Sequence, residues 1–120
     1  MSKILTIDDS ASLRQMVVLS LRSAGHEVSE AFDGVDGLEK ATADQFDAFI
    51  VDVNMPRMNG IELTRKLRAL QKYAHTPILI LTTESTDERK RQGRDAGATG
   101  WMVKPFNPTQ LVDTVRRVVP

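Results

Sequence analysis

Five short β-type runs alternate with helical stretches along the chain, and this alternation restricts the possible folds more than any other feature. The strand candidates are residues 3–7, 26–31, 46–51, 77–82 and 99–103. The first, third and fourth contain nearly continuous apolar runs, which are typical of strands buried on both faces. The second and fifth are more mixed, as strands near the edge of a sheet tend to be. The pattern therefore predicts a parallel sheet with helices on both sides.

Several segments between these strands have helical patterning. In residues 13–24 apolar side chains recur at helical spacing along one face, and Gly25 follows as a stop signal. Residues 60–70 carry a similar stripe. Asn107 followed by Pro108 has the form of an N-cap before a first-turn proline, with apolar residues at helical spacing behind it.

Residues 86–96 form a different kind of helix candidate. The segment is highly polar and is interrupted by Gly93, so we expect it to be the least firmly packed helix. Together the five strand–helix units, joined by short loops, predict an open, doubly wound α/β sheet.

Length and composition exclude several classes of protein. The 120 residues make a single domain, 1–120, and the absence of cysteine excludes disulfides, thiolate zinc sites and cysteine nucleophiles. The longest apolar runs, such as residues 16–19 and 78–81, are too short for a membrane span or a signal peptide. We therefore expect a cytoplasmic protein that does not bind membranes.

The charges cancel over the whole chain but not within its halves. Sixteen basic and sixteen acidic residues argue against a nucleic-acid binder. Residues 1–56 contain ten acids and four bases, net −6, whereas residues 57–120 contain six acids and twelve bases, net +6. This asymmetry fits either uneven helix surfaces or an acidic site in the first half and a basic docking surface in the second.

Polar residues stand at the carboxyl ends of four of the five predicted strands. The first strand ends in Asp8-Asp9, the third in Asp52, the fourth in Thr82-Thr83 and the fifth in Lys104. Doubly wound sheets bind ligands outside the carboxyl ends of their strands. One such aspartate is more often a helix cap than a functional group, but the convergence of the whole set predicts a site.

The chemistry of this predicted site follows from its charges. Three crowded carboxylates raise each other's pKa unless a cation joins them, and Lys104 supplies only one positive charge. Hard oxygen ligands without cysteine or a nearby histidine favour Mg²⁺, with Mn²⁺ as the alternative, over zinc. Mg²⁺ commonly takes a phosphate oxygen, and a carboxylate can act as a nucleophile that forms an acyl phosphate.

The ordered motifs resemble those of bacterial response-regulator receiver domains. They are Asp8-Asp9, the segment 52–60 (Asp-Val-Asn-Met-Pro-Arg-Met-Asn-Gly), Thr82 and Lys104-Pro105-Phe106. The likeness covers the whole chain and is greatest to the stand-alone, CheY-type chemotaxis receivers. It implies a flavodoxin-like fold, in which five parallel strands in the order 2-1-3-4-5 are combined with five helices.

The resemblance also implies a role for each matching residue. Asp52 would accept a phosphoryl group, Asp9 and Asp52 would hold Mg²⁺ through their side chains, Asp8 would act through water, and Asn54 would offer its backbone carbonyl. Thr82 would hydrogen-bond the phosphoryl group, Lys104 would pair with it, and the amide of Thr83 would add a donor. The Lys104–Pro105 peptide bond would be cis.

Four positions bear on switching and on phosphoryl lifetime. Trp101 falls where the family usually has Tyr or Phe, the aromatic that swings inward when the threonine moves; simple packing is the alternative role for it. Asn54 and Glu84 match the pair that flanks the path of attacking water. Thr83 stands where a small residue is common, so its bulk is expected to narrow access to the phosphoryl group.

The resemblance implies a signalling protein that catalyses its own phosphorylation and dephosphorylation, rather than an enzyme. A CheA-like histidine kinase would be the phosphodonor, and the surface of the fourth helix, fifth strand and fifth helix would act on a partner. A flagellar motor switch protein and a phosphatase are partners that the family allows, and the chain is expected to be a monomer. The alternative is a phosphate sink or relay intermediate without its own output partner.

Other functions lack specific residues. A haloacid-dehalogenase-type phosphatase has a second carboxylate two residues after its nucleophile, where this chain has Ser10 or Asn54. A flavodoxin requires a phosphate-cradling loop after the first strand, where Asp8-Asp9 would repel phosphate. His26 and His75 have no matching partners and are expected to be solvated. The basic run of Arg89, Lys90, Arg91 and Arg94 fits either a solvated face or a surface that meets partners.

Overall fold

A five-stranded parallel sheet forms the centre of the computed structural model, which describes residues 2–119. Its strands lie in the order β2-β1-β3-β4-β5, as the resemblance implied. Their bounds are β1 Lys3–Ile7, β2 Glu27–Ala31, β3 Ala48–Val51, β4 Ile78–Thr82 and β5 Gly100–Val103. Each strand is the predicted one or is shorter than it by one or two residues at its amino end.

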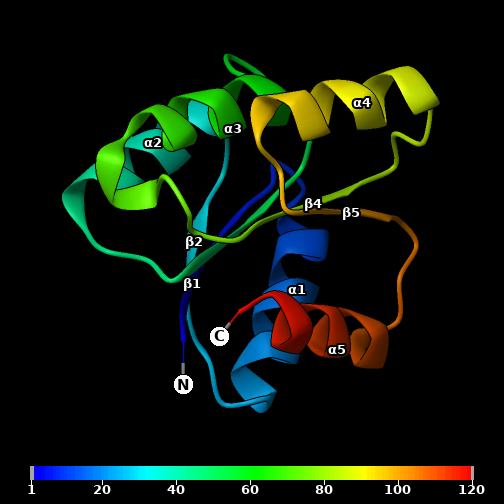
Figure 1. Ribbon diagram of the computed structural model, residues 1–120. Coiled ribbons are helices and arrows are strands. Elements are labelled where there is room, and N and C mark those ends of the chain that lie inside the picture. The colour runs from blue at the N-terminus through cyan, green and yellow to red at the C-terminus, as the bar shows by residue number, and fades with distance from the viewer. Residues whose placement is uncertain (1, 120) are drawn as a thin grey trace.

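Five α-helices cover the two faces of the sheet. They are α1 Ala11–Ser23, α2 Gly34–Ala43, α3 Gly60–Ala69, α4 Asp87–Ala96 and α5 Pro108–Val118, and a short 3₁₀ helix, η1 Gln71–Tyr73, follows α3. In Figure 1, α1 and α5 lie below the sheet and α2, α3 and α4 lie above it. No helix within residues 2–119 is long and apolar enough to cross a membrane.

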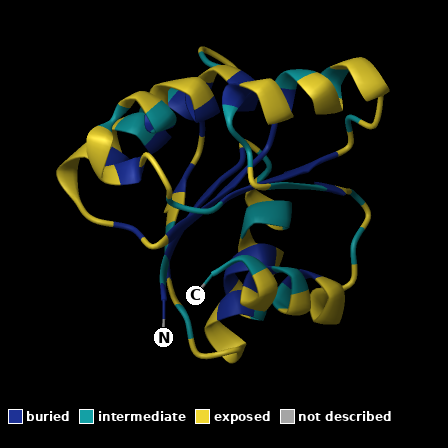
Figure 2. Cartoon of the chain, in the orientation of Figure 1, coloured by how far each residue is buried: buried dark blue, intermediate teal, exposed yellow. Residues whose placement is uncertain are grey.

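The core consists of two layers because successive strand residues point to opposite faces. Ile4 and Ile50 pack toward α1 and α5, whereas their neighbours Leu5 and Phe49 pack toward α2 and α3. Every residue of β3 and β4 is buried, and so is β1 after Lys3. Figure 2 shows this as dark strands between helices whose outer faces are exposed. The predicted burial of these strands on both faces is confirmed.

The second helix, α2, contributes only a few apolar side chains to the core, such as Leu38 and Ala41. Two glycines occupy positions where the helix approaches its neighbours closely. A Cβ on Gly37 would lie 2.9 Å from Cγ1 of Ile7, and one on Gly34 would lie 2.5 Å from the carbonyl oxygen of Met58. Glycine at these two positions lets α2 pack directly against Ile7 and Met58.

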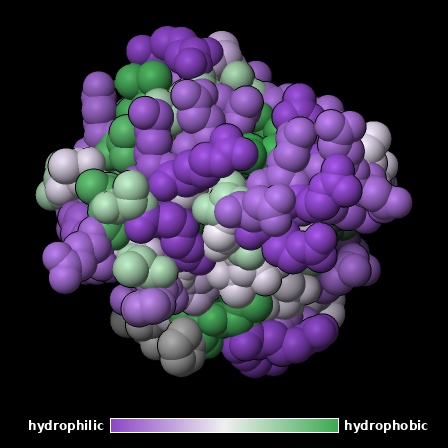
Figure 3. All heavy atoms as spheres, turned by 45° about the horizontal axis from the view of Figure 1, so that its top comes forward, coloured by the Kyte–Doolittle hydropathy of each residue, from purple (hydrophilic) through white to green (hydrophobic). Residues whose placement is uncertain are grey.

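The fourth helix, α4, buries few residues against the rest of the fold, as its polar sequence predicts. Only Gly93 and Ala96 of α4 are buried, and the helix ends at Gly97 in the left-handed conformation, with φ of 106°. Lys90, Arg91 and Arg94 are exposed. Figure 3, which brings this side of the molecule forward, shows a mostly hydrophilic surface there.

The two histidines differ in environment. His75 is exposed, as expected. His26 was expected to be solvated as well, and this is wrong for its ring. The residue is only partly exposed, and Nδ1 is shielded from solvent without a hydrogen-bond partner among the described residues. Burial therefore lowers the pKa of His26 below its ordinary value.

Candidate functional site

The carboxyl ends of β1 and β3 bring three carboxylates together. One oxygen from each of Asp8, Asp9 and Asp52 lies within 4.8 Å of the others. Asp8 and Asp52 are buried, with 4% and 7% of their surface exposed, whereas Asp9 is exposed. The convergence that the strand ends predicted is therefore present, with two carboxylates inside the fold and one facing solvent.

Local hydrogen bonds fix the two buried aspartates at the edge of the sheet. The backbone N–H of Asp52 donates to the carbonyl of Ile7, which continues the pairing of β1 and β3 by one residue. Asp8 Oδ1 accepts from the N–H of Ser10 at 2.9 Å, and Ser10 in turn caps the first turn of α1. Helix α1 therefore begins immediately after Asp8, Asp9 and the capping residue Ser10.

Among the described residues, Lys104 supplies the one ammonium group that lies beside the three carboxylates. Its Nζ donates to Asp8 Oδ2 at 2.8 Å and lies 3.7 Å from Asp52 Oδ2, and only 7% of its side chain is exposed. The Lys104 N–H donates to the carbonyl of Thr82, and the Lys104–Pro105 peptide bond is cis, as expected. The lysine is thus paired most closely with Asp8.

The pKa of Asp52 lies above its ordinary value of 3.8. Burial is the main cause, because desolvation disfavours the charged carboxylate, and the nearby charge of Asp8 acts in the same direction. The Thr82 hydroxyl and the Lys104 ammonium act in the opposite direction without overcoming the effect of burial. One ammonium among three carboxylates therefore leaves Asp52 in a position where a further cation would be favourable.

The donor set fits a hard divalent cation. All the clustered ligand atoms are carboxylate oxygens, and one of the three groups faces solvent, from which a metal with its waters can enter. Mg²⁺ is commonly bound by one or two carboxylates and keeps several waters. Asn54 is exposed in the loop after β3, two residues beyond Asp52.

That loop leads directly into α3 through an unusually close contact. The N–H of Gly60 donates to the carbonyl of Val53 at 2.9 Å, and a Cβ on Gly60 would lie only 2.0 Å from the carbonyl oxygen of Asp52. Only glycine fits at this position. Asn59 caps α3 by accepting from the N–H of Glu62. The β3–α3 loop, residues 52–59, is therefore short, and its two ends are held together by the hydrogen bond from Gly60 to Val53.

Thr82 and Trp101 are joined through one intervening residue. Thr82 is fully buried, and its hydroxyl accepts from the N–H of Glu84 at 3.3 Å. The carbonyl of Glu84 accepts from the indole N–H of Trp101 at 3.0 Å. Thr83, between them, is exposed. Thr82 and Trp101, the residues expected to switch, are thus both hydrogen-bonded to the backbone of Glu84.

The indole of Trp101 is partly buried between α4 and the sheet. It packs beside Ile80 and Ala96, and a Cβ on Gly93 would lie 2.6 Å from Cζ3 of the ring. The glycine that interrupts α4 therefore makes room for the tryptophan. The sequence drew attention to each residue separately but did not indicate that they are in contact. The packing role of Trp101 is confirmed, and its role as a switch stays a prediction.

Comparisons with known proteins agree with this geometry. The protein family described as "Response regulator receiver domain" matches residues 4–116 of the chain. The chemotaxis response regulator CheY4 of Vibrio cholerae has a similar structure, with 51% identity, a TM-score of 0.95 and 99% coverage of both chains. The receiver domain of sensor histidine kinase PA1611 from Pseudomonas aeruginosa was solved with a magnesium ion in its active site cleft. It is 26% identical, with a TM-score of 0.90 and coverage of 98% of this chain and 96% of that one.

A curated relative extends the likeness to a longer protein. Response regulator ArlR of Staphylococcus aureus is 36% identical over 119 residues, which are 99% of this chain. The chain spans about half (53%) of the length of that relative. The family description and the likeness of fold both cover nearly the whole chain. The chain therefore belongs to the response regulator receiver domain family of two-component signalling.

Proposed function

We propose that this chain is a phosphorylation-activated receiver, in which Asp52 accepts a phosphoryl group from the phosphohistidine of a partner kinase in a Mg²⁺-dependent reaction. The observation that carries the proposal is the position of Lys104. Its ammonium lies 2.8 Å from Asp8 and 3.7 Å from Asp52, beside three carboxylates whose oxygens lie within 4.8 Å of one another. This is a site for an anionic group and a cation together.

Asp9 and Asp52 would hold the metal through their side chains, Asp8 through water, and Asn54 through its backbone carbonyl. Mg²⁺, when bound, supplies positive charge that offsets the charge on the phosphoryl oxygens. A carboxylate oxygen of Asp52 forms a bond to phosphorus as the bond from phosphorus to the donor's imidazole nitrogen breaks. The electron pair of that bond leaves with the imidazole.

The remaining residues would act on the transferred group. Lys104 would neutralise charge on the phosphoryl oxygens, and the Thr82 hydroxyl and the Thr83 N–H would donate hydrogen bonds to them. Asn54 and Glu84 would control how water reaches the phosphoryl group. Preorganised donors of this kind account for much of the rate in phosphoryl transfer. Most of the catalytic machinery would therefore belong to the receiver rather than to its partner.

The output would be a changed surface formed by α4, β5 and α5. The similarity to a chemotaxis response regulator supports a role in chemotaxis, with a CheA-like kinase as donor and a target such as a flagellar motor switch protein. The exposed basic residues of α4, which include Lys90, Arg91 and Arg94, would favour an acidic region on such a partner. A phosphatase would shorten the signal.

Transfer from a small phosphoramidate, whose phosphorus–nitrogen bond resembles that of phosphohistidine, tests the proposal. We expect one phosphoryl group per chain in the presence of Mg²⁺ and almost none with a chelator. Asp47→Asn, which removes a carboxylate at the opposite end of the sheet, is the matched control and should react as the parent does. Labelling that is independent of Mg²⁺ would contradict the proposal. Phosphoryl half-life together with a pull-down of the phosphorylated form separates an output protein from a phosphate sink.

A further inference from the structure

The β3–α3 loop contains a strained backbone turn. Arg57 has φ of 66°, and it is the one non-glycine residue with positive φ in the described part of the chain. The N–H of Met58 donates to the carbonyl of Pro56 at 2.7 Å, so Arg57 is the central residue of a γ-turn of the rarer, positive-φ type. Strain of this kind persists only where the surrounding structure holds it in place, and it is concentrated at functional sites.

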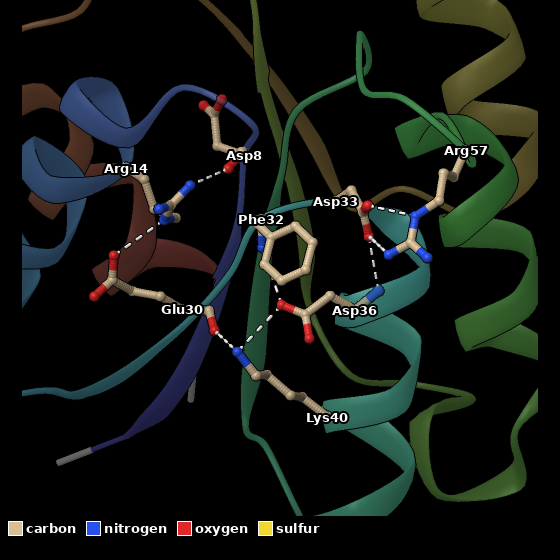
Figure 4. A network of polar contacts seen from close by, with 8 residues as sticks. All are labelled: Asp8, Arg14, Glu30, Phe32, Asp33, Asp36, Lys40 and Arg57. Atoms are coloured by element: carbon tan, nitrogen blue, oxygen red, sulfur yellow. Dashed lines mark hydrogen bonds and ion pairs between the residues drawn. The ribbon is translucent and has the colours of Figure 1, made fainter.

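A bidentate ion pair holds this turn to the start of α2. The Arg57 guanidinium donates to both carboxylate oxygens of Asp33, from Nε at 2.7 Å and from Nη2 at 3.0 Å (Figure 4). The side chain of Asp33 is only 4% exposed, and it also caps α2 by accepting from the N–H of Asp36. Paired hydrogen bonds of this geometry fix orientation as well as distance.

A second contact presses the same loop against the same helix. Gly34, the first residue of α2, has no room for a side chain, because a Cβ would lie 2.5 Å from the carbonyl oxygen and 2.7 Å from Cβ of Met58. Arg57 also lies over the ring of Phe32, 6.0 Å from its centroid. Three successive residues, 32–34, therefore contact the γ-turn from one side.

Polar contacts continue from this point to the acidic cluster. Asp36 pairs with Lys40, whose ammonium also donates to the backbone carbonyl of Glu30. The carboxylate of Glu30 accepts from Arg14, and Arg14 donates to the backbone carbonyl of Asp8 at 2.6 Å (Figure 4). The network thus connects the two loops that carry the proposed metal ligands, one after β1 and the other after β3.

We propose that Arg57 and Asp33 form a positioning pair for divalent cation binding. By holding the γ-turn, the pair fixes the β3–α3 loop and so presents the backbone carbonyl of Asn54, three residues before Arg57, toward the cation site at Asp9 and Asp52. Neither residue touches the cation. The inference rests on the proposed function, because it assigns a supporting role at the same metal site. Residues that orient metal ligands in this indirect way commonly matter almost as much as the ligands.

Two substitutions separate the ion pair from other effects. Arg57→Gly removes the guanidinium, but glycine adopts positive φ without strain, so the turn itself stays accessible. Asp33→Asn removes the charge, but asparagine can still cap α2. Asp44→Asn is the matched control, because it breaks the ion pair of Asp44 with Lys3 at the other end of the sheet.

Mg²⁺ affinity is measured by calorimetry on the unphosphorylated proteins. We expect about tenfold weaker binding for Arg57→Gly and for Asp33→Asn, and a similar loss, not a doubled one, for the double variant, because both changes remove one interaction. Asp44→Asn should bind as the parent does. In the metal-free proteins, amide hydrogen exchange of Asn54, Met55, Arg57 and Met58 should be faster in both variants than in the parent, whereas exchange in β1 and β3 should not change.

The outcomes distinguish this inference from the function on which it rests. Parent-like Mg²⁺ affinity in both Arg57→Gly and Asp33→Asn, with only thermal stability lowered, would mean that the pair is merely structural and would overturn the inference alone. Absence of Mg²⁺ binding by the parent would contradict the proposed function and the inference together. Weaker Mg²⁺ binding in the two variants, together with faster amide exchange confined to the β3–α3 loop, would support the inference.

Discussion

The indole N–H of Trp101 donates a hydrogen bond to the backbone carbonyl of Glu84, with 3.0 Å between the two heavy atoms. The backbone N–H of the same Glu84 donates to the hydroxyl of Thr82 at 3.3 Å. One residue of the β4–α4 loop therefore connects the buried threonine to the aromatic side chain of β5. If the Thr82 hydroxyl moved toward a phosphoryl group on Asp52, its hydrogen bond with the N–H of Glu84 would be lost, and the loop that holds Trp101 would be free to move.

Thr82→Ala tests this connection. The variant should still accept phosphate, because Asp52, Lys104 and the metal ligands remain, but it should switch poorly. A modification shifts two states only through its different interactions with them, and the hydroxyl supplies one such difference. Trp101 is the one tryptophan of the chain, so its fluorescence reports the change. Beryllofluoride, a phosphoryl mimic, should shift it in the parent and much less in Thr82→Ala.

Thr83→Ala serves as the control for that experiment. It makes the same chemical change at the next residue, where the side chain is exposed and is expected to affect access to the phosphoryl group but not switching. The parent's fluorescence shift should be retained. Equal shifts in Thr82→Ala and in the parent would mean that the threonine does not control the aromatic.

Gly93→Ala should destabilise the protein even though alanine favours helices. The gain in helix propensity is about 1 kcal/mol, but the new Cβ would lie 2.6 Å from the Trp101 ring, and overpacking of a filled site costs roughly 1–3 kcal/mol. We expect a net loss of about 1 kcal/mol in urea unfolding.

The same substitution should have the opposite effect without the indole. In a Trp101→Ala background, Gly93→Ala should stabilise the protein by about 1 kcal/mol, because only the propensity difference remains. A double-mutant cycle measures the coupling between the two positions. Destabilisation of equal size in both backgrounds would show that α4 does not depend on this contact.

Asp52→Asn should stabilise the metal-free protein at neutral pH. Folding raises the pKa of Asp52, so above that pKa the folded state carries a buried charge that the unfolded state keeps in water. Below the ordinary value of 3.8 the carboxyl is protonated in both states and the penalty disappears. The difference in melting temperature between variant and parent should therefore be largest at neutral pH and should shrink as the pH falls toward 4. A difference that grows on acidification would contradict the assigned direction.

Asp9→Ala should remove most of the Mg²⁺ affinity, with a loss of tenfold or more. Asp9 is the exposed member of the cluster, so the substitution leaves the core unchanged. Calorimetric titration with Mg²⁺ measures the loss, and Asp47→Ala, which removes a carboxylate far from the site, should bind normally. Unchanged affinity in both Asp9→Ala and Asp52→Ala would show that the metal is held elsewhere.

Much of the fold and the convergence of the site could be predicted from the sequence, because both depend on local patterns. Apolar runs mark the buried strands, and parallel strands in one sheet deliver whatever follows them to one edge. Asp8, Asp52 and Lys104 were therefore recognisable as neighbours although they are distant in sequence.

The features that were not predicted depend on contacts between distant residues. The pairing of Asp33 with Arg57 and the positive φ of Arg57 are set by the loop meeting the start of α2, and neither has a local signature. The space that Gly93 leaves for Trp101 is a tertiary fit of the same kind. The shielding of His26 Nδ1 likewise depends on its surroundings in the fold, which the sequence does not display.

The most direct test of the central claim locates the phosphoryl group chemically. An acyl phosphate on an aspartate is reduced by borohydride to the alcohol, so the modified residue becomes homoserine and can be found by peptide mass spectrometry. After reaction with a phosphoramidate and Mg²⁺, we predict homoserine at position 52 and none at positions 8 or 9. Homoserine at position 8 or 9, or phosphate incorporated into Asp52→Asn at the parent's level, would contradict the assignment of Asp52 as the phosphoryl acceptor.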